Sequence, residues 1–106
     1  GDAALEPLRA VLRANPASSV FVALAHRLCE AGRADEAETI CREGLRHQPD
    51  LPTGKVALAR ALMERGRLRE AQEVLVALTK SQPDQGDSWR WLGEVVLRRG
   101  DMPRAR

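Results

Sequence analysis

Few cysteines, few lysines and no long apolar stretch are the clearest absences in this chain of 106 residues. Cys29 and Cys41 are too few to form a disulfide framework, which favours a reducing compartment. The uninterrupted apolar runs are only a few residues long, whereas a membrane-spanning helix needs roughly 20 residues. The basic residues are almost all arginine, a bias that we attribute to genomic base composition. We therefore expect a soluble, cytoplasmic bacterial protein without direct membrane insertion.

Sequence motifs of catalysis and of metal binding are also missing. The chain has no serine nucleophile motif and no phosphate-binding glycine loop, and turns account for its glycines. His26, Cys29, Cys41 and His47 are candidate metal ligands by residue type alone. We expect Cys41 to face the interior of a helix pair and His47 to lie at its far end, so the four side chains do not converge on one ion. The sequence thus predicts no catalytic residue, no cofactor and no metal ion.

The charged residues show no excess of one sign large enough to identify a partner. Seventeen basic and fifteen acidic residues give a net charge of +2, and the two signs alternate as they do on solvated helix faces. Glutamates interrupt the first group of arginines, and no aromatic platform accompanies it. We therefore expect no nucleic acid partner, although arginines gather around the predicted turns: Arg65, Arg67, Arg69, Arg98, Arg99, Arg104 and Arg106.

A fixed spacing between glycines, shared by alanines and prolines, is the strongest positive feature of the sequence. These small or helix-ending residues recur at one constant interval, and the residues around them recur with them. A fixed period of this length indicates a repeat array, in which each unit packs only against its neighbours. The recurring positions are Gly32, Gly66 and Gly100, then Ala37, Ala71 and Ala105, then Pro49 and Pro83. We call the interval from Gly32 to Gly66 the repeat period.

Apolar residues follow helical spacing along nearly the whole chain, and no alternating strand pattern is present. Glycine supplies the left-handed residue that ends one helix of each pair, and proline stops the other. Pro7 belongs to the opening turn of a helix in residues 1–17, and Asp101 with Pro103 is typical of a cap and a first turn. The class is therefore all-α, with further helices predicted at 18–31, 34–47, 52–65, 68–81 and 86–99.

The segment Trp89-x-x-Leu92-Gly93-x-x-Val96-x-x-x-Gly100-x-x-x-x-Ala105 resembles the tetratricopeptide repeat. The resemblance covers the whole chain: residues 1–17 as the second helix of a preceding repeat, 18–51 and 52–85 as complete repeats, and 86–106 as a truncated one. It implies a right-handed α-solenoid of antiparallel helix pairs, about six helices and a truncated seventh. We expect a fragment of a longer protein of this family. The sequence departs from the family pattern at Phe21 and Lys55, in place of tryptophan, and at Gly44 and Leu78, in place of alanine.

The resemblance also implies a concave groove, lined by the first helix of each repeat, that holds a peptide or a partner helix. The mixed apolar and polar character of the predicted lining favours an apolar or mixed ligand. We expect Trp91 to anchor that ligand, while Arg60 and Arg90 fix its orientation together with Glu94. The residues predicted to contact the partner are Val22, His26, Val56, Arg60, Met63, Arg90, Trp91 and Glu94.

Further predictions concern the groove and its tryptophans. A subgroup of this family binds the terminal carboxylates of chaperone tails through a clamp of lysines, asparagines and an arginine. The corresponding positions here hold Val22, His26, Ala57, Asp87 and Trp91, so we exclude that activity. Trp89 lies on the opposite side of its helix from Trp91 and is expected to pack into the core near residues 74–78. Arg60 is expected to pair with a glutamate one repeat away, at position 94.

The sequence therefore predicts a non-enzymatic protein-interaction module, a scaffold or adaptor. An alternative reading is a substrate-recognition or self-association segment of a larger enzyme or assembly factor whose catalytic domain lies elsewhere. Truncation of the last repeat leaves Leu92, Val95 and Val96 without their usual cover. We expect these residues to form an exposed apolar strip through which the C-terminal helix pair can self-associate.

Overall fold

The computed structural model describes residues 2–100, which form helices and connecting turns without any strand. This confirms the all-α class and a helical repeat solenoid. None of the helices in the described part of the chain is long and apolar enough to cross a bilayer. After a short 3-10 helix at Asp2–Ala4, the α-helices are α1 (Glu6–Ala14), α2 (Phe21–Glu30), α3 (Ala34–His47), α4 (Pro52–Glu64), α5 (Leu68–Ser81) and α6 (Gly86–Gly100).

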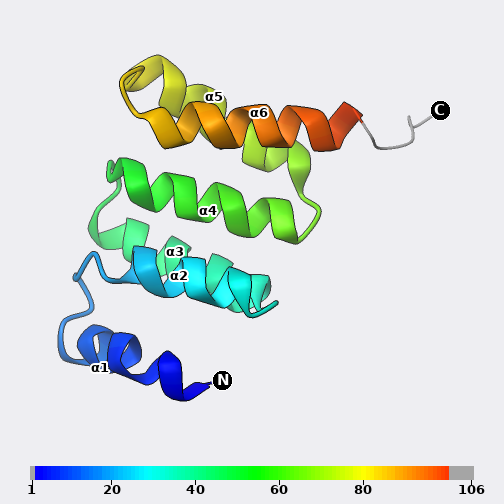
Figure 1. Cartoon of the computed structure of the whole chain (residues 1–106). Helices are drawn as coiled ribbons and strands as arrows, with labels where there is room; N and C mark the ends of the chain where they lie inside the picture. The colour runs from blue at the N-terminus through cyan, green and yellow to red at the C-terminus, as the bar shows by residue number, and fades with distance from the viewer. Residues whose placement is uncertain (1, 101–106) are drawn as a thin grey trace.

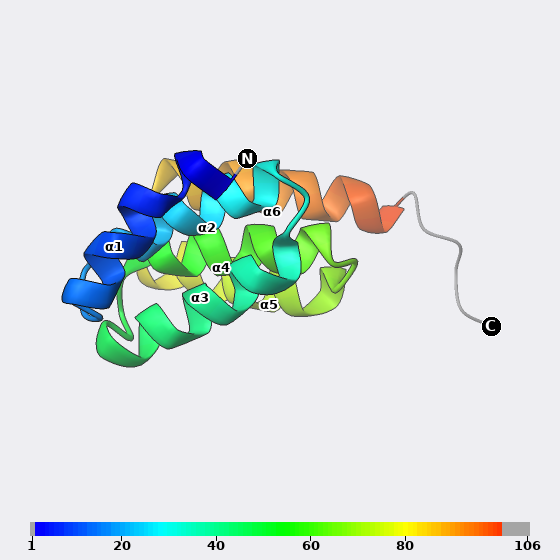
Figure 2. The same cartoon turned by 90° about the horizontal axis from the view of Figure 1, so that it is seen from below.

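The helices form two rows. In Figure 1, α2, α4 and α6 lie one above another, and α3 and α5 lie behind them. Figure 2, turned by 90°, places α3 and α5 on one side of the molecule and α2 and α6 on the other. Each helix of the first row packs on its sequence neighbours and on the next member of its own row, and α1 packs on α2. The result is an elongated stack with extents of 47 × 30 × 21 Å.

Glycine ends α2 and α4 in the predicted way. Gly32 and Gly66 have φ angles of +77° and +80°, a left-handed conformation that side chains with a Cβ rarely adopt. The amide of Arg33 donates to the carbonyl oxygen of Leu28 at 2.8 Å, and the amide of Arg67 donates to that of Leu62 at 2.9 Å. These bonds satisfy carbonyls that a helix end leaves unpaired. The same turn therefore follows both helices, one repeat period apart.

The predicted helix bounds agree closely with those observed. The helices at 34–47 and 68–81 have the predicted limits, Pro7 lies in the first turn of α1, and α4 and α6 differ from prediction by one residue at their ends. The exception is α2, which begins at residue 21 and not at 18. Turns occupy residues 15–20, because Ser18 donates its amide to Asn15 and accepts the amide of Val20 on its hydroxyl. The predicted cap at Asp101 and Pro103 lies outside the described residues.

Small residues lie at the helix contacts in the first two helix pairs. Ala25 and Ala37 are fully buried, and so are their equivalents Ala59 and Ala71. Small side chains at these positions let the backbones of the paired helices approach closely, as the sequence predicted. Gly93, the equivalent position in α6, is exposed. The last helix therefore presents to solvent the side that the earlier pairs bury.

Phe21 explains why glycine stands in place of the family's alanine at position 44. Its ring is only 1% exposed and lies against two glycines, Gly44 of α3 and Gly54 of α4. A Cβ at position 44 would lie 2.6 Å from Phe21 Cδ1 and closer still to Cγ and Cδ2, and a Cβ at position 54 would lie 2.8 Å from Phe21 Cζ. Glycine at these two positions therefore makes the room that a buried phenylalanine requires.

Trp89 corrects a prediction. Its side chain is 51% exposed, and its indole N–H donates to the carbonyl oxygen of Pro83 at 2.8 Å. The expectation of core packing against residues 74–78 is wrong, because elements that follow in the chain cover this position. Phe21 stands at the equivalent position of α2 and is covered by α3 and α4. No described helix follows α6, so the tryptophan ring stays largely in solvent.

Candidate functional site

The predicted contact residues are centred on Arg60, in the middle of α4. Its Nη1 donates to His26 Nδ1 of α2 at 3.0 Å and lies 3.9 Å from Glu30 Oε2. Its guanidinium carbon lies 5.4 Å from the centroid of the Trp91 ring of α6. One side chain thus connects the first helices of three successive repeats. We call His26, Arg60, Arg90 and Trp91 the arginine–tryptophan cluster.

Trp91 supports two guanidinium groups. Arg90, its neighbour on α6, places its guanidinium carbon 5.1 Å from the ring centroid, and Arg60 approaches from α4. Cations within about 6 Å of an indole centroid are attracted by the negative face of the ring. The indole itself is partly buried and packs against the core. Trp91 therefore holds two arginines in place, and its faces are less open to an apolar ligand than the sequence suggested.

His26 contributes to the cluster as an acceptor. A guanidinium can only donate, so the bond from Arg60 requires an unprotonated Nδ1. Burial lowers the pKa of His26 below 6.5, and the positive charge of Arg60 lowers it further against the opposing effect of Glu30 and Asp87. The imidazole is therefore neutral at neutral pH, and the cluster carries the two charges of Arg60 and Arg90.

The expected pair between Arg60 and Glu94 does not form. Glu94 accepts from Nε of Arg98 at 3.1 Å, four residues along the same helix. Arg98 also lies 3.8 Å from Glu64 of α4. The prediction placed Arg60 and Glu94 on one stripe, but arginine at 98 is closer to Glu94 in the helical register. Arg60 therefore has His26 as its hydrogen-bond partner, with Glu30 at 3.9 Å and the Trp91 ring beside it.

The remaining predicted residues differ in exposure. Val22 is half-buried and packs against the core. Val56 and Met63 are each only 3% exposed, because α2 and α6 flank α4 on both sides. Neither of these two side chains offers surface to a partner in this structure. Ala23, in contrast, is exposed on α2 one residue from Val22.

The two cysteines are free and buried. Burial raises the pKa of Cys41 to about 12 and also raises that of Cys29, so both remain thiols at neutral pH. Among residues 2–100, no group of three or more histidine, cysteine, aspartate or glutamate side chains could hold a metal ion.

Outside this cluster, ion pairs connect the helices. Glu38 of α3 is 7% exposed and accepts from Arg42 Nε at 2.8 Å and from Arg65 Nη1 at 2.7 Å. Arg42 also reaches Glu70 of α5 at 2.8 Å. Burial acts to raise the pKa of Glu38, but the hydrogen bonds from the two arginines outweigh it and hold the pKa below 4.5. These contacts join α3 to both helices of the following pair.

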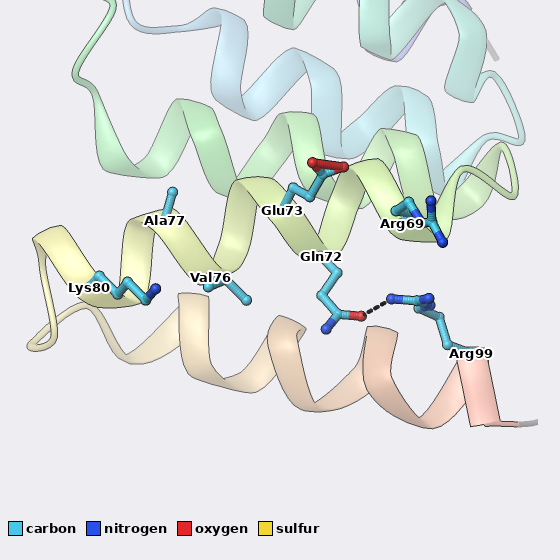
Figure 3. A pocket seen from close by; sticks show the side chains of 7 residues that line it. All are labelled: Arg69, Gln72, Glu73, Val76, Ala77, Lys80 and Arg99. Atoms are coloured by element: carbon cyan, nitrogen blue, oxygen red, sulfur yellow. Dashed lines mark hydrogen bonds between the residues drawn. The ribbon is translucent and has the colours of Figure 1, made fainter.

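The next helix pair has a pocket in the equivalent place. Gln72, Val76 and Arg99 follow Glu38, Arg42 and Arg65 by one repeat period, and Arg99 donates to Gln72 Oε1 at 2.7 Å. Figure 3 shows this bond across the space between α5 and α6. Valine does not reach across as Arg42 does, so a cavity of about 360 Å³ remains open there. Its lining is Arg69, Gln72, Glu73, Val76, Ala77, Lys80 and Arg99.

Most of the exposed large apolar side chains in the described part of the chain lie on α6. Trp89 is joined there by Val96, 50% exposed, and Leu97, 68% exposed. Leu92 is partly buried, and Val95 is fully buried against the preceding helices. Val95 therefore does not belong to the predicted apolar strip, which Trp89 and Leu97 extend instead. Leu97 is exposed although its equivalents in the repeat, Cys29 and Met63, are buried.

Comparisons with known proteins agree with this architecture. Two family models described as Tetratricopeptide repeat match the chain, one over residues 19–43 and the other over residues 56–106. A search of the curated proteins found no match. Repeats of this family generally mediate protein–protein interaction. The two matches, the repeat period and the paired helices together show that the chain belongs to the tetratricopeptide repeat family.

Proposed function

We propose that this chain is a protein-interaction module that binds a peptide segment or a partner helix on the face formed by α2, α4 and α6. The observation that carries the proposal is the arginine–tryptophan cluster, which joins three helices through one side chain. Val22 and Ala23 extend the same face along α2. Partly buried polar groups beside small and apolar residues are characteristic of preformed binding surfaces.

The charged side chains favour a protein partner over nucleic acid. Two of the arginines that gather near the turns are engaged with acidic residues: Arg65 with Glu38, and Arg98 with Glu94. Nucleic acid binding needs cationic side chains that neutralise phosphates and so release the counterions condensed on the nucleic acid, and arginines already paired with carboxylates contribute little to this. We therefore propose that the partner is a protein or peptide and not a nucleic acid.

We also propose that the module works without catalysis, in the cytoplasm. Cys29, the thiol one turn from His26, has a pKa raised by burial, so it lacks the thiolate character of an activated nucleophile. Buried free thiols also suit a reducing compartment. Recognition alone accounts for the arrangement of the proposed face.

A selection from a random dodecapeptide library, displayed on phage, tests this function. We expect the protein to enrich peptides whose binding is lost in Ala23→Arg, because the long side chain obstructs an exposed position on α2. Ala10→Arg is the matched control, since Ala10 is exposed on α1, which is not one of the three helices of the proposed face. Failure to enrich any peptide, or binding that Ala23→Arg leaves intact, would contradict the proposal.

A second candidate function is self-association through the outer side of α6. The exposed rings and branched side chains of Trp89, Val96 and Leu97 support it, because monomeric surfaces rarely carry such a contiguous apolar patch. We propose that a second copy of the chain covers this patch. Sedimentation velocity over a range of concentrations should show a dimer that Leu97→Glu abolishes. A monomer at all concentrations would contradict it.

A further inference from the structure

Arg60 has fewer hydrogen bonds than its burial calls for. Its side chain is 19% exposed, and its Nε is buried without a hydrogen-bond partner. Among residues 2–100, the one hydrogen bond of this guanidinium is that from Nη1 to His26. Glu30, the nearest carboxylate, lies at 3.9 Å, beyond hydrogen-bond distance. A partly buried charge without full pairing destabilises the free protein, and a ligand that supplies the missing hydrogen bonds would offset that cost.

Other partly buried arginines in the described structure are paired directly. Arg9, 22% exposed, lies 2.5 Å from Glu36, and Arg65, 34% exposed, lies 2.7 Å from Glu38. Arg60 is less exposed than either, yet a neutral imidazole takes the place of the carboxylate. Glu94 of α6 follows Arg60 by one repeat period and is the carboxylate expected to pair with it, but Glu94 bonds to Arg98 instead.

Arg90 adds a second cation beside the first. It is exposed near the start of α6 and lies over the same indole ring as Arg60. It has no carboxylate partner within residues 2–100. The Trp91 ring restrains both guanidinium groups. In Arg60, Nε is buried and Nη1 bonds to His26, so Nη2 is the nitrogen left to donate to a ligand. Two guanidinium groups restrained by one ring offer a carboxylate the charge-assisted donors that it prefers.

We propose that Arg60 and Arg90, held by Trp91, form a subsite for the carboxylate of one aspartate or glutamate in a bound partner peptide. This inference rests on the proposed function and names the chemistry that the face recognises. It differs from the two-carboxylate clamp excluded above, whose positions fall on Val22, His26, Ala57, Asp87 and Trp91 and include neither arginine. A side-chain carboxylate inside an extended segment is the occupant, and a free chain terminus is not required.

Nearby acidic residues limit how the subsite works. Glu30 is mostly exposed beside Arg60, Asp87 lies near enough to influence His26, and Glu94 and Glu64 contact Arg98. The face therefore has no broad positive field to attract acidic peptides from a distance. Selectivity arises at short range, from hydrogen bonds to one carboxylate, and depends on its position in the peptide.

The test uses a dodecapeptide enriched in the selection described above and its variant with glutamine at the acidic position. Affinities are measured by tryptophan fluorescence in Trp89→Phe protein, where Trp91 is the remaining indole. We expect the acidic peptide to bind the parent about tenfold or more tightly than the glutamine peptide. In Arg60→Gln and Arg90→Gln, this preference should fall to less than about twofold. Arg46→Gln removes an equal charge from α3 and should retain the full preference.

The outcomes separate this proposal from the broader one. Selected peptides that require an open Ala23 position but have no preferred acidic residue would overturn the subsite and leave the binding face intact. An acidic preference that survives both Arg60→Gln and Arg90→Gln would also overturn it. Arg90 is exposed, so Arg90→Gln remains a valid test if Arg60→Gln fails to fold. Failure to enrich any peptide would overturn the binding face and the subsite together.

Discussion

Replacing Gly44 with alanine tests the packing of the first helix pair, because two physical effects predict opposite results. Alanine is favoured over glycine in a helix interior by about 1 kcal/mol, which predicts a more stable protein. The structure predicts the reverse, since the new Cβ would lie 2.6 Å from Phe21 Cδ1, with two ring carbons closer still. The ring is 1% exposed, so it must shift within the core to make room for the new Cβ.

The magnitude follows from these two terms. Overpacking a well-filled core costs typically about 1–3 kcal/mol, and a Cβ in contact with the body of a buried ring belongs at the upper end. Subtracting the gain of about 1 kcal/mol in helix propensity leaves a net loss of roughly 2 kcal/mol. Gly93→Ala is the matched control, because it lies inside α6 with nothing within 4 Å of the new Cβ. It should stabilise the protein by about 0.5–1 kcal/mol.

Urea unfolding followed by far-UV circular dichroism measures both changes. The double variant Phe21→Leu, Gly44→Ala should be less destabilised than the sum of its single changes, by about 1 kcal/mol, because the smaller side chain relieves the contact. A Gly44→Ala protein that gains stability to the same extent as Gly93→Ala would refute the described position of Phe21. A double variant whose destabilisation equals the sum of those of Phe21→Leu and Gly44→Ala would refute it as well.

Three further predictions concern ionisable groups. Hydrogen bonds from Arg42 and Arg65 hold the pKa of Glu38 below 4.5 despite its burial, so the stabilisation it provides is present above pH 4.5 and is lost as the pH falls through the lowered pKa. The difference in unfolding free energy between the parent and Glu38→Gln should therefore shrink in acid, and a constant difference would contradict this. Burial, and to a lesser extent the charge of Arg60, lowers the pKa of His26 below 6.5, so protonation of His26 opposes folding. The unfolding free energy of the parent should therefore decline below pH 6.5, and that of His26→Gln should decline less. Identical pH profiles of the two proteins would contradict this. Cys41, with a pKa of about 12, should react with Ellman's reagent only after unfolding in urea, and rapid reaction of the folded protein would contradict its burial.

Local patterns in the sequence predicted the helices well. Gly32 and Gly66 end helices through their own backbone conformation, and proline opens or stops helices through its fixed φ. The spacing of apolar residues in α3 and α5 likewise depends on the geometry of each helix alone. Such features depend on residues close in the chain, so the sequence displays them directly. Two of the helices consequently match their predicted limits.

Burial and pairing between helices could not be predicted in the same way. Trp89 is exposed because no described helix follows α6, and Val56 and Met63 are buried because helices flank α4 on both sides. The repeat spacing predicted that Arg60 pairs with Glu94, but Glu94 bonds to Arg98 on its own helix and Arg60 bonds to His26. Positions equivalent in the repeat thus acquire different surroundings, which the period alone does not reveal.

The central claim is that a partner segment lies on the face of α2, α4 and α6. Its most direct test is an NMR titration of the ¹⁵N-labelled protein with a dodecapeptide enriched in the selection. The account predicts chemical shift changes at Ala23, Arg60 and Trp91, including the Trp91 indole N–H, with little change along the outer sides of α3 and α5. Changes confined to α3 and α5, with the Trp91 indole unaffected, would contradict it.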